Sequence, residues 1–167
     1  MFKDLTKILA IDVEKCTGCR NCELACSIHH TGTFNPRRAR IQVIKEERKD
    51  LVVPIVCLQC ESPLCEKACP NGAIQRNEFG TLYVNNEVCI GCQNCVAACI
   101  YGGIEIDPYT RKAIKCDLCG GDPACIKACD YGAITFVESS PKGRLQRAKG
   151  VEVLSQIFEA SFAEAEE

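Results

Sequence analysis

Cysteine is the residue through which this chain could do chemistry, because its sixteen cysteines fall into four groups of four. In the first and third groups, two, two and three residues separate successive cysteines. The second and fourth groups differ only in the middle gap, which holds four and five residues. The groups are Cys16, Cys19, Cys22 and Cys26; Cys57, Cys60, Cys65 and Cys69; Cys89, Cys92, Cys95 and Cys99; and Cys116, Cys119, Cys125 and Cys129. Such a run wraps three thiolates around one iron–sulfur cube, so the spacing predicts [4Fe–4S] clusters.

Zinc and disulfide bonds are the two alternatives for these cysteines. Zinc motifs usually hold two cysteine pairs a dozen or more residues apart, whereas the first group places four thiols within eleven residues. Disulfides persist in oxidising compartments, and the first ten residues (MFKDLTKILA) carry charges where a signal peptide has an apolar run. We therefore expect a cytoplasmic protein with iron–sulfur clusters. No segment approaches the roughly 20 apolar residues of a membrane span.

The segments around the cysteines repeat as well, and they indicate the elements that position the ligands. An alanine precedes the last cysteine of every group, and a turn with an apolar pair follows in PNGAI (residues 70–74) and DYGAI (130–134). The third and fourth cysteines of each group are four residues apart, so one helix would carry both on one face. Gly18 and Gly91 would allow the tight loop between the first two cysteines. Strands are predicted at 41–45 and 51–53, and at 73–76 and 81–84 around a turn at 77–80.

Composition argues against several other functions. The formal net charge of −2 gives no reason to expect a nucleic-acid partner. We find no phosphate-binding loop, dinucleotide fingerprint or nucleophile motif, so we expect no catalytic residue in this chain. The apolar share of 47% includes the cysteines, and there is no tryptophan. We therefore expect the clusters to form much of what the fold is built around.

The pairing of the groups follows from a local resemblance. Residues 57–106 resemble a bacterial two-cluster ferredoxin, in which the fourth cysteine of each group ligates the other cluster. The first and fourth groups are then left to pair with each other. The alternative pairs the first group with the second and the third with the fourth; the 30-residue link between Cys26 and Cys57 argues mildly against it. The preferred sets are Cys16, Cys19, Cys22 and Cys129; Cys57, Cys60, Cys65 and Cys99; Cys89, Cys92, Cys95 and Cys69; and Cys116, Cys119, Cys125 and Cys26.

Over about residues 7 to 137, the four groups in this order resemble the iron–sulfur subunits of molybdenum and tungsten oxidoreductases of the dimethyl sulfoxide reductase and formate dehydrogenase type. The segment from Leu24 to Ile41 is similar to the small partners of tungsten aldehyde ferredoxin oxidoreductases. The resemblance implies an α+β protein of two pseudo-symmetric bacterial-ferredoxin folds, one inserted in the other. The outer unit would comprise residues 1–50 and 107–140, the inner unit 51–106, and a C-terminal amphipathic helix 143–167. Ferredoxins commonly have proline after the fourth cysteine, and only Pro70 fits, which leaves the other helix ends open.

The resemblance also implies a function, that of an electron-transfer subunit which is not an enzyme by itself. Single electrons would pass through four [4Fe–4S] clusters. At one end would be a tungsten- or molybdenum-pterin catalytic subunit, with the aldehyde oxidoreductase type favoured. At the other end would be a flavin subunit, a soluble ferredoxin or a second copy of the chain. The alternatives are the same role for formate dehydrogenase, hydrogenase, carbon monoxide dehydrogenase or a benzoyl-CoA-type reductase, and, more remotely, a zinc-binding interaction module. Members of this family can also be exported in the folded state together with a partner that carries the signal peptide. Export of this kind is the alternative to a cytoplasmic location.

Basic residues and two histidines lie close to the cysteine groups. His29 and His30 are expected in a turn after Cys26, exposed or bonded to backbone. Cations beside the ligands either favour the reduced clusters or serve solubility; they are Lys15, Arg20, Lys67, Lys115 and Lys127. A second basic run is a candidate docking site for an acidic partner and comprises Arg37, Arg38, Arg40, Arg48 and Lys49.

The C-terminal segment carries an apolar pattern of its own. Val151, Leu154, Phe158 and Phe162 recur at helical spacing, which predicts the amphipathic helix. Its apolar face would pack either on the chain's own core or on another subunit.

Overall fold

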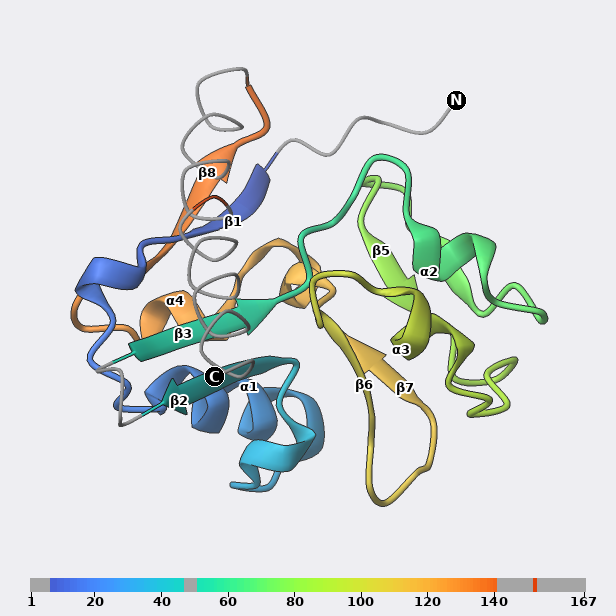
Figure 1. The fold of residues 1–167 in the computed structure, drawn as a ribbon, viewed down its shortest axis with the longest axis horizontal. Coiled ribbons are helices and arrows are strands. Elements are labelled where there is room, and N and C mark those ends of the chain that lie inside the picture. The colour runs from blue at the N-terminus through green and yellow to red at the C-terminus, as the bar shows by residue number, and fades with distance from the viewer. Residues whose placement is uncertain (1–6, 47–50, 141–151, 153–167) are drawn as a thin grey trace, which may run out of the picture.

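The computed structural model describes residues 7–46, 51–140 and 152. Its elements are short helices and paired antiparallel strands, as expected for an α+β protein (Figure 1). In chain order they are β1 (Lys7–Ile11), η1 (Val13–Lys15), α1 (Asn21–Thr31), η2 (Pro36–Arg38), β2 (Ile41–Glu46), β3 (Leu51–Val56), α2 (Leu64–Lys67), β4 (Ile74–Arg76), β5 (Leu82–Val84), α3 (Asn94–Ala98), β6 (Ile104–Ile106), β7 (Ala113–Lys115), η4 (Leu118–Gly121), α4 (Ala124–Lys127) and β8 (Ile134–Glu138). The predicted C-terminal helix lies, apart from residue 152, outside the described residues.

The strands of the described residues form four two-stranded antiparallel sheets. β1 pairs with β8, so that Ile11 lies opposite Ile134 and residues from the two ends of the described chain meet (Figure 1). The other three sheets, β2–β3, β4–β5 and β6–β7, are hairpins of consecutive strands. The predicted strands around residues 41–45, 51–53, 73–76 and 81–84 correspond to β2, β3, β4 and β5 within a few residues. The β6–β7 hairpin crosses the boundary at 106/107 between the predicted units.

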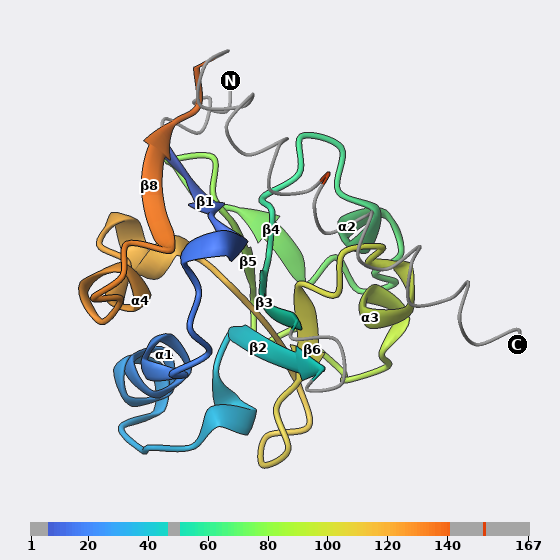
Figure 2. The same ribbon diagram turned by 60° about the vertical axis from the view of Figure 1, so that its left-hand side comes forward.

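The helices pack in two pairs, and each pair brings two cysteine groups together. α1 packs against α4, whereas α2 packs against α3. The two pairs lie on opposite sides of the molecule, as both views show (Figures 1 and 2). Each has its own buried cluster: Cys22, Cys26, Cys116 and Cys125 with residues such as Ile41 in one, Cys65 and Cys95 with residues such as Leu82 in the other. Cysteines are thus part of both cores.

Helix ends differ from the prediction in two respects. α1 carries both Cys22 and Cys26, as expected, but it continues to Thr31, so the two histidines lie on a helix and not in a turn. In the other three groups the helix ends before the fourth cysteine. There the chain turns at Gly72, Gly102 and Gly132, each at a φ of +62 to +64° and each donating its N–H to the carbonyl of that cysteine. Left-handed backbone of this kind favours glycine, so the repeated glycine of the motif allows the turn that follows the fourth cysteine.

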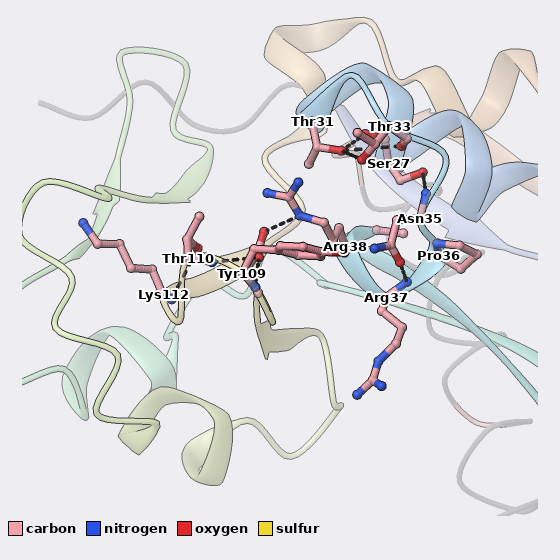
Figure 3. A network of polar contacts seen from close by, with 12 residues as sticks. Ser27, Thr31, Thr33, Asn35, Pro36, Arg37, Arg38, Tyr109, Thr110 and Lys112 are labelled. Carbon is pink, nitrogen blue, oxygen red and sulfur yellow. Dashed lines mark hydrogen bonds and ion pairs between the residues drawn. The ribbon is translucent and has the colours of Figure 1, made fainter.

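A polar network joins η2 to the loop between β6 and β7 (Figure 3). Arg38 donates from Nε to Oδ2 of Asp107 at 2.9 Å, and its guanidinium lies over the ring of Tyr109 at 4.9 Å from the centroid. Asp107 is 3% exposed and also accepts the backbone N–H groups of Tyr109 and Thr110. These bonds outweigh the effect of burial, which would raise the pKa of the Asp107 carboxyl, and the pKa is lowered. Arg38 is thus committed to an internal contact.

Candidate iron–sulfur centres

Two small hollows are lined by cysteines from distant parts of the chain. One is lined by Cys16, Cys19 and Cys22 together with Cys129. The other is lined by the third group's first three cysteines and by one cysteine from the second group, namely Cys89, Cys92, Cys95 and Cys69. Three cysteines of one group therefore meet the fourth cysteine of another group in both hollows.

Several of the remaining cysteines also lie close to cysteines of other groups. Burial raises the pKa of the Cys125 thiol to about 12, and the negative charges of Cys26 and Cys119 add to the effect. Burial raises the pKa of the Cys65 thiol to about 11, with contributions from Cys57 and Cys99. Thiols that influence one another in this way are close in space. Metal binding must therefore displace protons that the free thiols would hold at neutral pH.

The chemistry of these sites fits iron–sulfur clusters. All sixteen cysteines are free of disulfide bonds, so their sulfurs are available as thiolate ligands. Backbone N–H groups donate to several of them, including Cys26 from Arg40 at 3.2 Å, Cys69 from Ala73 at 3.2 Å and Cys99 from Gly103 at 3.3 Å. Hydrogen bonds to cluster sulfurs are one of the means by which a protein sets a cluster's potential. The metal ligands would thus be thiolates, and backbone N–H groups surround them.

The loops between the first cysteines adopt the backbone that the sequence predicts. Gly18 and Gly91 have φ angles of +69° and +70°. A Cβ at Gly91 would lie 2.2 Å from the carbonyl oxygen of Arg111, so no side chain fits there. Arg20 and Gln93, two residues further on, are also left-handed, at +64° and +69°. The first and third loops therefore share one conformation.

Exposure distinguishes the four cysteine groups. Cys19 of the first group and Cys92 of the third are the only exposed cysteines, and both line the hollows described above. Each cysteine of the second and fourth groups is intermediate or buried. The two most accessible cysteines therefore lie one in each hollow.

Gln59 connects the second and fourth groups through a buried hydrogen-bond frame. Gln59 is 5% exposed. Its side-chain Nε2 donates to the carbonyl of Cys116 at 2.6 Å and to that of Leu82 at 3.1 Å, and its Oε1 accepts the N–H of Leu82 at 2.7 Å. Lys115, 2% exposed, donates to the same Leu82 carbonyl at 3.1 Å. The sequence pattern indicates Lys115 only as one of five basic neighbours and does not reveal Gln59, whose partner in the fourth group is 57 residues away.

His30 contacts the fourth group. Its Nε2 lies 3.5 Å from the sulfur of Cys119 and 3.6 Å from Oδ1 of Asp117. Burial lowers the pKa of His30 to about 4, so the ring is neutral at physiological pH. His29 is exposed on the same helix. The histidine pair is therefore split into a surface residue and a largely buried neighbour of a cysteine.

Part of the predicted basic docking site is engaged within the chain. Arg38 pairs with Asp107, as described above, and Arg40 with Asp117. Arg37 is exposed, and the other two predicted members, at 48 and 49, lie outside the described residues. Two of its five members are thus structural ion pairs, because carboxylates from distant segments meet them.

These features define a ferredoxin-like iron–sulfur protein, in which short loops and helices surround sets of cysteine thiols. The chain belongs to the 4Fe-4S dicluster domain family, which matches residues 49–139. A second match to a 4Fe-4S dicluster domain covers residues 15–74. Two such domains and sixteen cysteines in ferredoxin spacing mean that the cofactors are four [4Fe–4S] clusters and that the protein is of the electron-transfer type.

Relatives of known name agree with this class. The electron transport protein HydN of Escherichia coli K12 is 40% identical over 102 residues, which is 55% of each chain. The polyferredoxin-like subunit of the aliphatic sulfonate oxidoreductase of Pyrococcus furiosus is 42% identical over 89 residues, 53% of this chain and 51% of that one. One chain of the anaerobic dimethyl sulfoxide reductase of E. coli K12 is 36% identical over 97 residues, 51% of this chain and 47% of that one. The present chain spans about half the length of these curated relatives.

Among solved structures, the active-site complex BamBC of benzoyl-coenzyme A reductase contains a chain that is 28% identical, with a TM-score of 0.49 and coverage of 96% of this chain and 97% of that one. Within the described part of the present chain, no helix has both the length and the apolar character needed to cross a bilayer.

Proposed function

We propose that the chain is the electron-relay subunit of a tungsten- or molybdenum-containing oxidoreductase and has no catalytic residue of its own. Its four clusters would use the nested ligand sets, in which the first group shares cysteines with the fourth and the second with the third. The observation that carries the pairing is the composition of the two hollows, each with three cysteines of one group and the fourth cysteine of its partner. Two ferredoxin-like units, one inserted in the other, follow from this pairing.

The contacts between the groups support one order for the relay. Burial raises the pKa of the Cys116 thiol, and the charge of Cys57 adds to the effect. Gln59 joins the segments of these two cysteines, so the sets that contain them would be neighbours. The sets of Cys92 and Cys19 would then stand at the two ends. Exposure agrees with this order, because these two ligands reach the surface. When bound, each cluster takes up and releases one electron at a time.

What this chain's residues do in the relay is to fix positions and surroundings. α1 carries Cys22 and Cys26, which belong to two different ligand sets, so a single turn of helix ties two neighbouring sites together. The short helices α2, α3 and α4 bring the third and fourth cysteines of their groups together in a related way. No cysteine of the middle sets is exposed, whereas each end set has one exposed cysteine, so contact with partners would fall to the ends.

The partner follows from the resemblance and from the relatives' names. A relative that is a polyferredoxin-like subunit of an oxidoreductase, and another that is one chain of a reductase, support membership in such a complex. We propose a tungsten- or molybdenum-pterin subunit of the aldehyde oxidoreductase type at one end, with a flavin subunit, a ferredoxin or a second copy of the chain at the other, and a cytoplasmic location. Formate dehydrogenase, hydrogenase, carbon monoxide dehydrogenase and benzoyl-CoA-type reductase are the alternative partners.

Serine variants test the pairing. The nested sets predict that Cys19→Ser and Cys129→Ser alter the same electron paramagnetic resonance (EPR) signal, and that Cys92→Ser and Cys69→Ser alter a different one. Sequential pairing instead predicts that Cys69→Ser matches Cys19→Ser. Anaerobic purification should give about sixteen irons per chain and an absorbance bleached by dithionite, as expected of four cubes. Zinc without a reducible chromophore would refute the relay. Co-purification from the native source, with metal analysis of the catalytic subunit, tests the partner.

A further inference from the structure

Lys115 is a buried cation that the relay does not yet explain. It is the last residue of β7 and is 2% exposed. An ammonium group has three N–H donors, and this one has a single hydrogen-bond acceptor among the described residues, the carbonyl of Leu82 at 3.1 Å. Within the same part of the chain, no carboxylate lies within ion-pair distance of it. Lysine is almost never fully buried unless it is paired, so a negative charge must be close by.

The surroundings of Lys115 point to the cysteine sites as that charge. The next residue is Cys116, a ligand of one proposed middle set. The charge of Lys115 also lowers the pKa of the Cys65 thiol, although burial is the larger effect and the pKa is raised overall. Cys65 belongs to the other middle set. The ammonium therefore acts on the set of Cys65, and its neighbour in the chain, Cys116, belongs to the other middle set. Four thiolates around a cluster make each set net negative.

Gln59 holds this ammonium in place. Its side-chain amide shares the Leu82 carbonyl with Lys115 and binds the Cys116 carbonyl as well. Leu82 itself is 1% exposed. The carbonyl that receives the ammonium is therefore fixed by a second donor, and the position of the charge is fixed with it.

The other cations beside the cluster ligands differ from Lys115. Lys15, Arg20, Lys67 and Lys127 are all exposed, where water and salt screen their charge. Lys15 and Lys127 also pair with the carboxylates of Asp12 and Asp122. Nη1 of Arg20 also lies 3.7 Å from Oε2 of the buried Glu23. Exposure to water and these local pairs account for the four side chains, but they cannot account for a side chain hidden from solvent.

We propose that Lys115 is the counter-charge of the two middle clusters and raises their reduction potentials relative to the clusters at the ends. This inference rests on the ligand sets and relay order proposed above. A fixed cation in a site of low dielectric constant favours the more negative, reduced form of a neighbouring cluster. An electron on the relay would then occupy the middle of the chain of clusters in preference to the exposed ends.

The test compares four variants of the anaerobically purified holoprotein. Lys115→Gln removes the charge but keeps a donor for Leu82, and Lys115→Met removes both. Lys115→Arg keeps the charge. Lys67→Met is the matched control, because Lys67 lies on α2 between the ligands Cys65 and Cys69 but is exposed, and its side chain binds only Ser62 among the described residues. Redox titration followed by EPR gives the potential of each cluster, and the cysteine variants assign the signals.

We expect at least one middle cluster in Lys115→Gln and Lys115→Met to become harder to reduce. The ratio of reduced to oxidised cluster at a fixed ambient potential should fall about tenfold, which is about 59 mV for one electron. Lys115→Arg and Lys67→Met should stay within about twofold of the wild-type protein. Unchanged potentials in a neutral variant that retains all its iron would overturn the inference and leave the relay itself standing. A wild-type protein with fewer than four clusters would instead refute the proposed function.

Iron content keeps the test decisive when a variant assembles poorly. If both neutral variants lose the middle clusters whereas Lys115→Arg keeps them, charge is what the clusters require, and the inference is supported. If Lys115→Arg loses them as well, the side chain's shape matters instead of its charge, and the inference fails.

Discussion

Nη1 of Arg40 lies 2.5 Å from Oδ2 of Asp117, and this ion pair holds together the segments that carry one proposed ligand set. The backbone N–H of Arg40 donates to the sulfur of Cys26, and the Asp117 carboxylate accepts the N–H of Cys119. The pKa of the Asp117 carboxyl is lowered, because the charge and hydrogen bond of Arg40 outweigh the effect of burial. The pair thus fixes Cys26 against the fourth group, although 77 residues separate Arg40 from Asp117 along the chain.

Arg40→Met should therefore destabilise the holoprotein. Loss of one partner from a fully buried pair costs roughly 3–5 kcal/mol, and the side chains here are 19% and 29% exposed, so we expect about 2 kcal/mol. The control is Lys127→Met, whose pair with Asp122 is 65% and 74% exposed and should cost about 0.5 kcal/mol. Anaerobic urea unfolding, followed by cluster absorbance, measures both. Equal losses in the two variants would contradict a structural role for the Arg40 pair.

His30→Phe should lower the reduction potential of the cluster that Cys119 binds. A metal-bound thiolate has no proton to donate, so Nε2 of His30 would donate to the sulfur of Cys119. A neutral hydrogen bond contributes about 0.5–1.5 kcal/mol, so its loss should change the ratio of reduced to oxidised cluster roughly two- to tenfold at a fixed potential. Donors to sulfur favour the more negative reduced form, which sets the direction. His29→Phe is the matched control, since that ring is exposed on the same helix. Shifts of equal size in both variants would show that the contact with Cys119 is irrelevant.

Local spacing explains how much of this molecule could be predicted from sequence. The tight loops at Gly18 and Gly91 and the hairpin after Pro70 depend on residues a few positions apart, and the structure contains them. The contact between His30 and Cys119 spans 89 residues, and that between Gln59 and Cys116 spans 57. No short pattern encodes such contacts, because they exist only after the two helix pairs have packed. The burial of Lys115 escaped prediction for the same reason.

Gly103→Ala should disrupt one cluster selectively. A Cβ at Gly103 would lie 2.6 Å from Cα of Cys57, and the N–H of Gly103 donates to the sulfur of Cys99. Both cysteines belong to one proposed ligand set, so the backbone shift that relieves the clash must displace its ligands. We expect a loss of about four irons per chain together with one EPR signal.

The neighbouring glycine provides the control for this substitution. Gly102→Ala places a Cβ at an ordinary 3.7 Å from the Ile55 side chain, but in left-handed backbone at φ +64°. It should cost about 1–2 kcal/mol of stability without loss of iron. If Gly102→Ala loses as much iron as Gly103→Ala, backbone strain and not the contact with Cys57 decides cluster retention.

Removal of the clusters should unfold most of the chain. The helices α2, α3 and α4 have four or five residues, whereas isolated helices shorter than about 12 residues are marginal in water. The described strands form only two-stranded sheets, which are marginally stable by themselves. Cysteines such as Cys22 and Cys125 are buried in the cores, and their thiols, with pKa values raised to about 12 by burial, would regain protons once the metal leaves.

Chelation of the iron after oxidation should accordingly abolish most of the far-UV circular dichroism and the slow amide exchange of β1 and β8. Anaerobic incubation of the apoprotein with iron, sulfide and a thiol reductant should restore both, and protein taken through the same steps without chelator is the control. The reason lies in where the long-range links are. Within the described residues, the long-range links besides the β1–β8 pair are mainly the two helix pairs and their buried cores, and both cores contain cysteines that a cluster would bind. An apoprotein that keeps protected amides in β1 and β8 would show that these contacts fold the chain without metal.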